Sequence, residues 1–290
     1  MRNALRLAVA LCCVFGVMLG ARAEDSNQEP KEQLKILFIG NSFTFYNSLN
    51  DTVQDMLNAS GYSAKAVRMA PGGWRFRQHF KGELPAKSKD KPTPEVIASQ
   101  KWDYVVLQEY SSGAVSDRAE FLEYGQKLAE MIRQNNPTTK ILLYQTWERC
   151  DGMFEGYGDD PERREAVLKS WEKRYKAPNQ ETVEALKDGI QGGYDQLAKL
   201  TDSTVVPVGK GFFTVGDKYN LFCDEGKNTP YHPNPLGTYL GGCMFYKTIT
   251  GESPVGVYEK LSKFGKEYKL TAEEAEYLEK VADQVVVLPE

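Results

Sequence analysis

Five short and almost uninterrupted apolar runs are the feature that most constrains the fold of this chain. They are KILFIG, AKAVRM, YVVLQE, KILLYQ and TVVPVG, beginning near residues 35, 64, 104, 140 and 204. Continuous apolar strands are typical of a parallel sheet that helices cover on both faces, whereas a half-exposed strand alternates polar and apolar residues. The runs therefore predict five buried strands.

Helical patterns fill the intervals between these runs. Apolar residues recur at three- and four-residue spacing over 48–59 and 117–135, and further helices are expected over about 179–200 and about 235–250. A last helix is predicted after Thr271, because Thr271 and Glu274 match a capping box that precedes an apolar stripe. Strands that alternate with helices imply βαβ crossovers, so we predict an α/β fold, a three-layer α/β/α sandwich.

The first 23 residues match a secretory signal peptide. MRNALR is basic, LAVALCCVFGVMLG is an apolar run of 14 residues, and ARA precedes an abrupt switch to polar residues. We expect cleavage after Ala23 and a secreted or periplasmic protein. A membrane anchor is the alternative, although the run is short for a span. A polar leader at 24–33 and a single domain at 34–290 follow, with a surface loop at 82–94 and a charged excursion at about 150–179.

Charge and cysteine content exclude several classes of partner. Removing residues 1–23 takes three arginines from the 36 basic side chains and leaves 33 against 40 acidic ones. No basic cluster suits nucleic acid or anionic lipid. Cys150, Cys223 and Cys243 remain, without the CxxC spacing of a zinc site, so we expect no metal. One disulfide is compatible with export, and a Cys223–Cys243 bond across the 232 segment is one hypothesis.

Few side chains offer chemistry. The chain has two histidines, His79 and His232, and its first apolar run ends in Gly40-Asn41-Ser42. Ligands bind at the carboxyl ends of strands in open α/β sheets, so a serine there is either a helix cap or a nucleophile. A nucleophilic hydroxyl needs an adjacent base. His232 is either that base or a loop histidine bonded to backbone, and a structural role is favoured for His79.

Four segments in chain order resemble the sequence blocks of the SGNH (GDSL-like) hydrolases. They are GNSFT, a downstream Gly-Gly, VVLQE and HPNPLGTYL, and the resemblance spans about residues 34–250. It implies a flavodoxin-like, mostly parallel five-stranded sheet and ester hydrolysis by a serine nucleophile without a metal or other cofactor. Ser42 matches the nucleophile, with Asn41 in place of the usual aspartate, and His232 matches the histidine that takes its proton.

The resemblance also implies donors for an oxyanion. The Ser42 N–H is one, and the glycine of the second block corresponds to Gly72 or Gly73, of which Gly73 is favoured. The third block departs from the family's Gly-x-Asn-Asp, since Gln108 stands where the asparagine is expected. It resembles the Gln-Gly-Glu variant of carbohydrate acetylesterases, in which a side-chain amide could still donate; a structural amide is the alternative. Glu109 is expected to be orienting or structural.

The acid behind the histidine is the main departure. Members of the family carry it three residues earlier, where this chain has Thr229, which cannot stabilise an imidazolium as a carboxylate does. LFCDEGKNTPYHP resembles the family motif with residues inserted before the histidine. Asp224 is the favoured acid, because its task is to orient the imidazole and needs spatial reach rather than fixed spacing. Glu225 and a dyad without an acid are the alternatives.

Several aromatic side chains could form a stacking surface for a sugar ring: Trp74, Trp147, Tyr157 and Trp171. At most two are expected at a site, because aromatic residues are more often in the core, and Trp74 and Trp147 are the candidates.

The residues and the resemblance together predict an exported serine esterase acting on carboxylic esters, chiefly acetyl esters of carbohydrates. One alternative is a catalytically weak or inactive carbohydrate-binding protein with the same fold. A lipase or thioesterase is another, but no long apolar lid is evident. The expected partner is a small-molecule or glycan ester, with no nucleic acid and no stable membrane span after cleavage.

Overall fold

The computed structural model describes residues 32–85, 88–110, 113–147, 180–221, 232–261 and 270–288. The predicted signal peptide, most of the polar leader and the 150–179 excursion lie outside these ranges, so they stay predictions from sequence. Within the described ranges, no helix has the length and apolar character that a membrane span requires.

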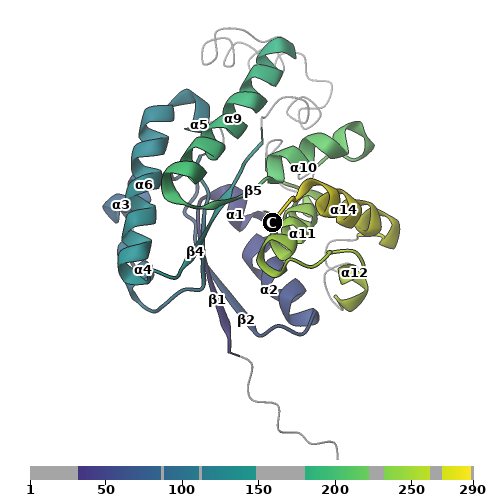
Figure 1. Cartoon of the computed structure of the whole chain (residues 1–290), viewed down its shortest axis with the longest axis horizontal. Helices are drawn as coiled ribbons and strands as arrows, with labels where there is room; N and C mark the ends of the chain where they lie inside the picture. The colour runs from purple at the N-terminus through teal and green to yellow at the C-terminus, as the bar shows by residue number, and fades with distance from the viewer. Residues whose placement is uncertain are drawn as a thin grey trace, which may run out of the picture. The chain divides into compact units, whose positions relative to one another are not determined.

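Five parallel strands form one sheet in the order β2-β1-β3-β4-β5 (Figure 1). They are β1 (Leu34–Ile39), β2 (Ala64–Met69), β3 (Tyr104–Leu107), β4 (Lys140–Tyr144) and β5 (Thr204–Val206). This is the flavodoxin order, in which the chain changes direction between β1 and β3. Each strand lies in the apolar run that predicted it, and the three-layer fold is confirmed.

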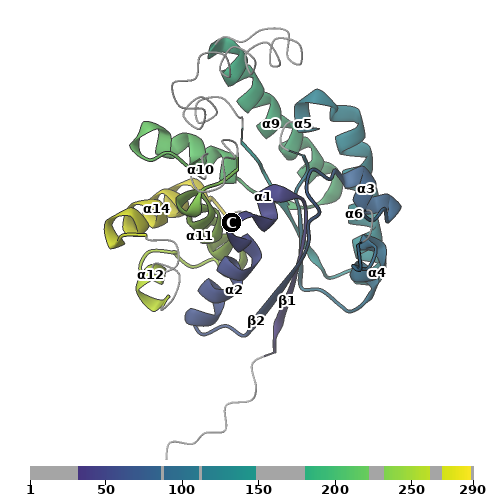
Figure 2. The ribbon, with the colours of Figure 1, turned by 180° about the vertical axis from the view of Figure 1, so that it is seen from behind.

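Helices cover both faces of the sheet (Figures 1 and 2). One layer contains α3 (Phe76–Lys81), α4 (Thr93–Ala98), α5 (Gly113–Ser116), α6 (Arg118–Asn135) and α9 (Gln180–Thr201). The other contains α2 (Leu49–Ala59), α10 (Val208–Val215), α11 (Pro235–Thr250), α12 (Val257–Lys260) and α14 (Ala272–Val285). Two short elements, α1 (Ser42–Phe45) and the 3₁₀ turn η1 (Tyr46–Ser48), connect β1 to α2.

The sheet separates two apolar cores. Successive strand residues point to opposite faces, so Ile36 and Phe38 of β1 pack with α2, α11 and α14, while Leu37 and Ile39 pack with α4, α6 and α9. All four side chains are fully buried. Burial on both faces is the reason that the β1 run contains no polar alternation.

The long helices agree with their predicted ranges. The Thr271–Glu274 capping box is confirmed, since Thr271 N–H donates to the Glu274 carboxylate (2.8 Å) and Glu274 N–H donates to Thr271 Oγ1 (3.2 Å). The predicted surface loop at 82–94 is too long, because α4 begins at Thr93 and the Thr93 side chain is buried. Helices α3, α4 and α10 are too short for a periodic pattern to reveal them.

The hypothesis of a Cys223–Cys243 disulfide is not supported. Cys243 lies on α11 with a free thiol and is fully buried. Burial raises the pKa of this thiol well above its ordinary value, so it stays protonated in the apolar core. Cys150 and Cys223 lie outside the described residues.

Gly209 of α10 packs directly on the backbone that follows β4. A Cβ at Gly209 would overlap the carbonyl oxygen of Thr146 and lie 2.9 Å from its carbonyl carbon, whereas a Cβ at Gly192 of α9 would meet nothing within 4 Å. We expect Gly209→Ala to lower the free energy of unfolding by about 1–3 kcal/mol through overpacking. Gly192→Ala, the matched control, should raise it by about 0.5–1 kcal/mol. Urea denaturation measures both, and equal effects would contradict this packing.

Candidate active site

Ser42 lies directly after β1, at the carboxyl edge of the sheet. It is the first residue of α1, and its side chain is partly exposed. Within the described ranges, neither its Oγ nor its N–H makes a hydrogen bond. The first N–H groups of a helix have no acceptor in the helix itself, so this N–H is available to an external oxygen.

The turn before Ser42 requires glycine at Gly40. A Cβ there would lie 2.5 Å from Thr44 Oγ1 and 2.6 Å from Gln108 Oε1. The Gly40 carbonyl accepts a hydrogen bond from His79 Nε2 (2.8 Å), and its N–H donates to Met69 of β2 (3.0 Å). Gly40, two residues before Ser42, is therefore bonded both to the neighbouring strand β2 and to α3 of one helical layer.

Asn41 joins this turn to two other segments. Its Nδ2 donates to the Trp74 carbonyl (2.9 Å), while its Oδ1 accepts from Gln108 Nε2 (3.0 Å) and from Phe43 N–H (3.2 Å). The Asn41 side chain is buried, at 2% exposed. A single carboxamide thereby fixes Ser42 relative to the end of β3 and to the turn that contains the Gly-Gly pair.

Gly73 is the third residue of that turn, in which Trp74 N–H donates to the Pro71 carbonyl (3.3 Å). Its φ is +72°, a value that the third position of such turns requires and that favours glycine. Gly73 is exposed, and its N–H donates to no acceptor in the described part of the chain. The hydrogen bond from Asn41 Nδ2 to the Trp74 carbonyl connects the turn that contains Gly73 to the start of α1.

Gln108 is oriented differently from the expected oxyanion donor. Its side chain is fully buried, and its two amide hydrogens are directed at Asn41 Oδ1 and at the Glu109 carbonyl. Its Oε1 accepts from Asn41 N–H (3.0 Å) and Thr44 Oγ1 (2.9 Å). Gln108 therefore positions the Ser42 turn in this conformation, and donation to a ligand would require Nε2 to leave Asn41.

His232 lies against the segment that Ser42 begins. Its ring stacks on Tyr46, with centroids 3.9 Å apart and planes 12° apart, and meets Phe43 edge-on at 5.5 Å. Asn47 Nδ2 donates to the Pro233 carbonyl (2.8 Å) and to Thr238 Oγ1 (3.1 Å). Residues about 190 positions apart are thus held at the same edge of the sheet, where the sequence predicts a serine and a histidine.

The described residues do not include every predicted participant. Asp224, Glu225 and Thr229 lie outside them, so the acid behind His232 stays a prediction from sequence. Tyr157 and Trp171 also lie outside the described ranges. Among those ranges, no group of three or more histidine, cysteine, aspartate or glutamate side chains could hold a metal ion.

Trp147 does not have its predicted position on a binding surface. It is fully buried, its ring stacks on Phe212 (4.1 Å, 4°), and it lies 4.7 Å from the ring of Phe43. Trp147 therefore offers no face to a sugar and instead packs against Phe43 of α1. Trp74 is partly exposed in the Gly73 turn and stays a candidate.

Two buried titratable residues support the site from the other layer. Glu109 is 3% exposed, and its carboxylate accepts hydrogen bonds from Phe76 N–H and Tyr110 N–H, both 2.7 Å long. Burial raises the pKa of Glu109 to about 7, against the opposing effect of these bonds. Burial lowers the pKa of His79 to about 4, so this histidine is neutral near pH 7. Their burial and their hydrogen bonds within the protein agree with the structural roles that the sequence favours, which stay predictions.

The comparisons with known proteins concern the fold. The sequence matches no family model and no curated protein. The structure is similar to a DUF4886 family protein from Bacteroides uniformis, with a TM-score of 0.64 at 17% identity, covering 87% of this chain and 94% of that one. It is also similar to a protein assigned as an SGNH hydrolase from Slackia heliotrinireducens, with a TM-score of 0.56 at 20% identity, covering 75% of this chain and 99% of that one. The three-layer fold is therefore the one found in SGNH (GDSL-like) hydrolases, as the sequence resemblance predicts.

The contacts of Asn41 predict that an amide is needed there. Asn41→Asp keeps acceptors for Gln108 and Phe43 but places a carboxylate against the Trp74 carbonyl, which loses its donor. We expect the free energy of unfolding to fall by about 1–3 kcal/mol. Ester turnover should fall about ten- to a hundredfold, because a displaced turn misplaces the Gly73 N–H.

Asn58→Asp is the matched control for this substitution. Asn58 bridges in the same way, donating to the Ala64 carbonyl (3.2 Å) and accepting from Ala64 N–H (2.7 Å), but at the amino end of β2. It should lower stability without changing turnover per folded molecule. If Asn41→Asp also left turnover unchanged, the positioning role of Asn41 would be refuted.

Glu109 and His79 predict opposite effects of pH on stability. Between about pH 4.5 and 7 the folded chain keeps a proton on Glu109 that the unfolded chain has lost, so stability falls as pH rises. Between about pH 4 and 6.5 the unfolded chain protonates His79 and the folded chain does not, so stability rises with pH. The two contributions largely cancel in the wild type.

Single substitutions should uncover each contribution. In Glu109→Gln the free energy of unfolding should rise more steeply from pH 5 to 7 than in the wild type, by at most about 3 kcal/mol over the window. In His79→Gln it should instead fall with pH. Denaturant titrations at pH 5, 6, 7 and 8 measure this, with the exposed Glu95→Gln as control. A pH-independent difference between wild type and Glu109→Gln would show that Glu109 does not titrate in this range.

Proposed function

We propose that this chain is a serine esterase that hydrolyses carboxylic esters, chiefly acetyl esters of carbohydrates. The observation that carries the proposal is the position of Ser42: its Oγ and N–H make no hydrogen bond within the described ranges, and His232 packs against the residues that follow it. The likeness of the fold to a protein assigned as an SGNH hydrolase supports the same class of reaction.

In the proposed reaction, Ser42 Oγ attacks the ester carbonyl carbon while His232 accepts the hydroxyl proton. The resulting oxyanion receives hydrogen bonds from the N–H groups of Ser42 and Gly73, which donate to no acceptor among the described residues. The tetrahedral intermediate expels the alcohol, which takes the proton from His232. Water then attacks the acyl-serine by the same route and releases the acid.

The sequence resemblance suggests two further participants, Asp224 and Gln108. Asp224 is proposed to orient the His232 imidazole and to support its charge, with Glu225 and no acid as alternatives. Gln108 is proposed mainly to hold the Ser42 turn, because its amide hydrogens are already paired. Its direct donation to the oxyanion is the alternative.

The proposed setting is outside the cytoplasm, after cleavage of the signal peptide at Ala23. An exported enzyme meets esters of extracellular glycans, which is consistent with the proposed substrate. Small acyl groups are favoured because the sequence has no long apolar lid segment.

Hydrolysis of p-nitrophenyl acetate tests the proposal. Ser42→Ala should lower kcat by at least about a thousandfold, and His232→Ala similarly, because nucleophile and base act as one unit. Ser63→Ala, a serine at the opposite edge of the sheet, is the control and should not change the rate. An activated phosphonate should label the wild type at Ser42, as read by peptide mass analysis.

The same assay distinguishes Asp224 from Glu225 as the acid behind His232, and an esterase from a carbohydrate-binding protein. A large loss in Asp224→Asn but not in Glu225→Gln would support Asp224, and the reverse would move the role to Glu225. If wild type and Ser42→Ala are equally slow and the phosphonate leaves Ser42 unlabelled, the esterase proposal is wrong. A carbohydrate-binding protein with the same fold would then be the better interpretation.

A further inference from the structure

A cavity of about 520 Å³ lies at the carboxyl end of the edge strand β2. This volume is within the range of about 300–1,000 Å³ that small-molecule sites occupy. The described residues that line it are Phe45, Arg68, Met69, Ala70, Pro71, Gly72, Pro85, Ser88 and Asp90. Ser42 and His232 are not among them, so the cavity lies beside the predicted catalytic residues and does not contain them.

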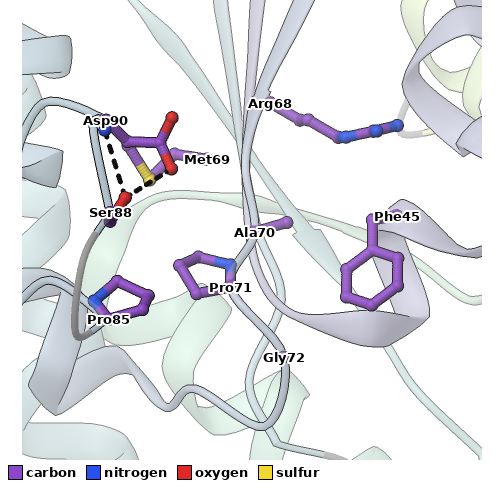
Figure 3. Close-up of a pocket in the computed structure, with 9 residues that line it drawn as sticks. All are labelled: Phe45, Arg68, Met69, Ala70, Pro71, Gly72, Pro85, Ser88 and Asp90. Atoms are coloured by element: carbon purple, nitrogen blue, oxygen red, sulfur yellow. Dashed lines mark hydrogen bonds between the residues drawn. The ribbon is translucent and has the colours of Figure 1, made fainter.

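The cavity is nevertheless bounded by the two segments that the proposed chemistry uses. Phe45 is the last residue of α1, the short helix that Ser42 begins. Gly72 precedes Gly73 in the turn that Asn41 ties to that helix. Figure 3 shows Phe45 facing the backbone from Ala70 to Gly72 across the cavity. A ligand in this cavity would therefore contact both the helix that Ser42 begins and the turn that contains Gly73.

One wall of the cavity carries the guanidinium of Arg68, whose position is fixed by hydrogen bonds. Arg68 Nη1 donates to Ser48 Oγ (3.3 Å) and to Asn50 Oδ1 (3.0 Å), and no acidic side chain of the described residues lies within ion-pair distance. Its remaining guanidinium hydrogens are free to donate to a ligand. Arg68 is exposed, so it keeps its charge at low cost.

The opposite wall carries the carboxylate of Asp90, whose position is fixed by hydrogen bonds with Ser88. Ser88 Oγ donates to Asp90 Oδ2 (2.8 Å), and Asp90 N–H donates back to Ser88 Oγ (3.1 Å). Asp90 Oδ1 has no donor among the described residues. In Figure 3, Ser88 and Asp90 lie on one side of the strand end and Arg68 on the other.

This combination of groups selects the kind of ligand. Hydroxyl groups both donate and accept, so a polyol can pair with either the Asp90 carboxylate or the Arg68 guanidinium. The ring of Phe45 adds an apolar face of the kind on which a sugar ring packs. A long acyl chain is disfavoured, because it would leave both charged groups next to hydrocarbon.

We infer that this cavity binds the alcohol part of the substrate, a sugar unit of an O-acylated glycan. The inference rests on the proposed ester hydrolysis and adds the site that recognises the leaving group. Phe45, Arg68 and Asp90 determine the specificity, whereas Ser42 and His232 determine the reaction.

The first test compares two substrates. For an O-acetylated neutral oligosaccharide such as acetylated xylotriose, Arg68→Gln and Asp90→Asn should each lower kcat/KM by about tenfold relative to p-nitrophenyl acetate, mainly through KM, since a hydrogen bond to a charged group is lost. Lys65→Gln, on the same strand, and Asp195→Asn, on α9, are exposed controls that should leave this ratio unchanged. An unchanged ratio in both cavity variants would overturn the inference and leave the esterase proposal intact.

The second test does not depend on turnover. In the Ser42→Ala background, calorimetry should show the acetylated oligosaccharide binding, with about tenfold weaker affinity in Arg68→Gln and Asp90→Asn. Equal affinities in all these proteins would refute the cavity as a sugar site. Loss of p-nitrophenyl octanoate hydrolysis in the cavity variants, with sugar esters unaffected, would identify an acyl site instead.

Discussion

The carboxamide of Asn41 is the interaction on which the candidate site depends. It donates to the carbonyl of Trp74 and accepts from Gln108 and Phe43, so one buried side chain joins the ends of β1 and β3 to the Gly-Gly turn. A carboxylate could accept but not donate in this arrangement. This accounts for the pairing of Asn41 with Gln108 directly before Ser42.

A second constraint brings the two ends of the domain together. Asn47 and Ser48 have positive φ values of 51° and 54°, a conformation that asparagine tolerates better than most residues. This reversal turns the chain from α1 into α2 and directs the Asn47 side chain towards Pro233 and Thr238. His232 consequently packs on Tyr46, and its place depends on a backbone conformation far away in the sequence.

The sequence was most informative where burial repeats regularly. Apolar runs predicted all five strands, and three- and four-residue spacing predicted the long helices, because both periods reflect which side chains face a core. Single side chains were less predictable. An indole such as Trp147 suits either a sugar surface or a core, and only its full burial and its contacts with Phe212 and Phe43 identified it as core.

The amino-acid sequence by itself determined the layered architecture, the strand positions and the pair of residues, Ser42 and His232, on which the proposed chemistry depends. The tertiary structure decided how polar groups are paired: the amide hydrogens of Gln108 meet Asn41 and Glu109, while the N–H groups of Ser42 and Gly73 donate to no acceptor in the described ranges. It also placed a cation and an anion on opposite walls of one cavity. Periodicity reports burial, but pairing depends on distances and angles between segments that only the folded chain brings together.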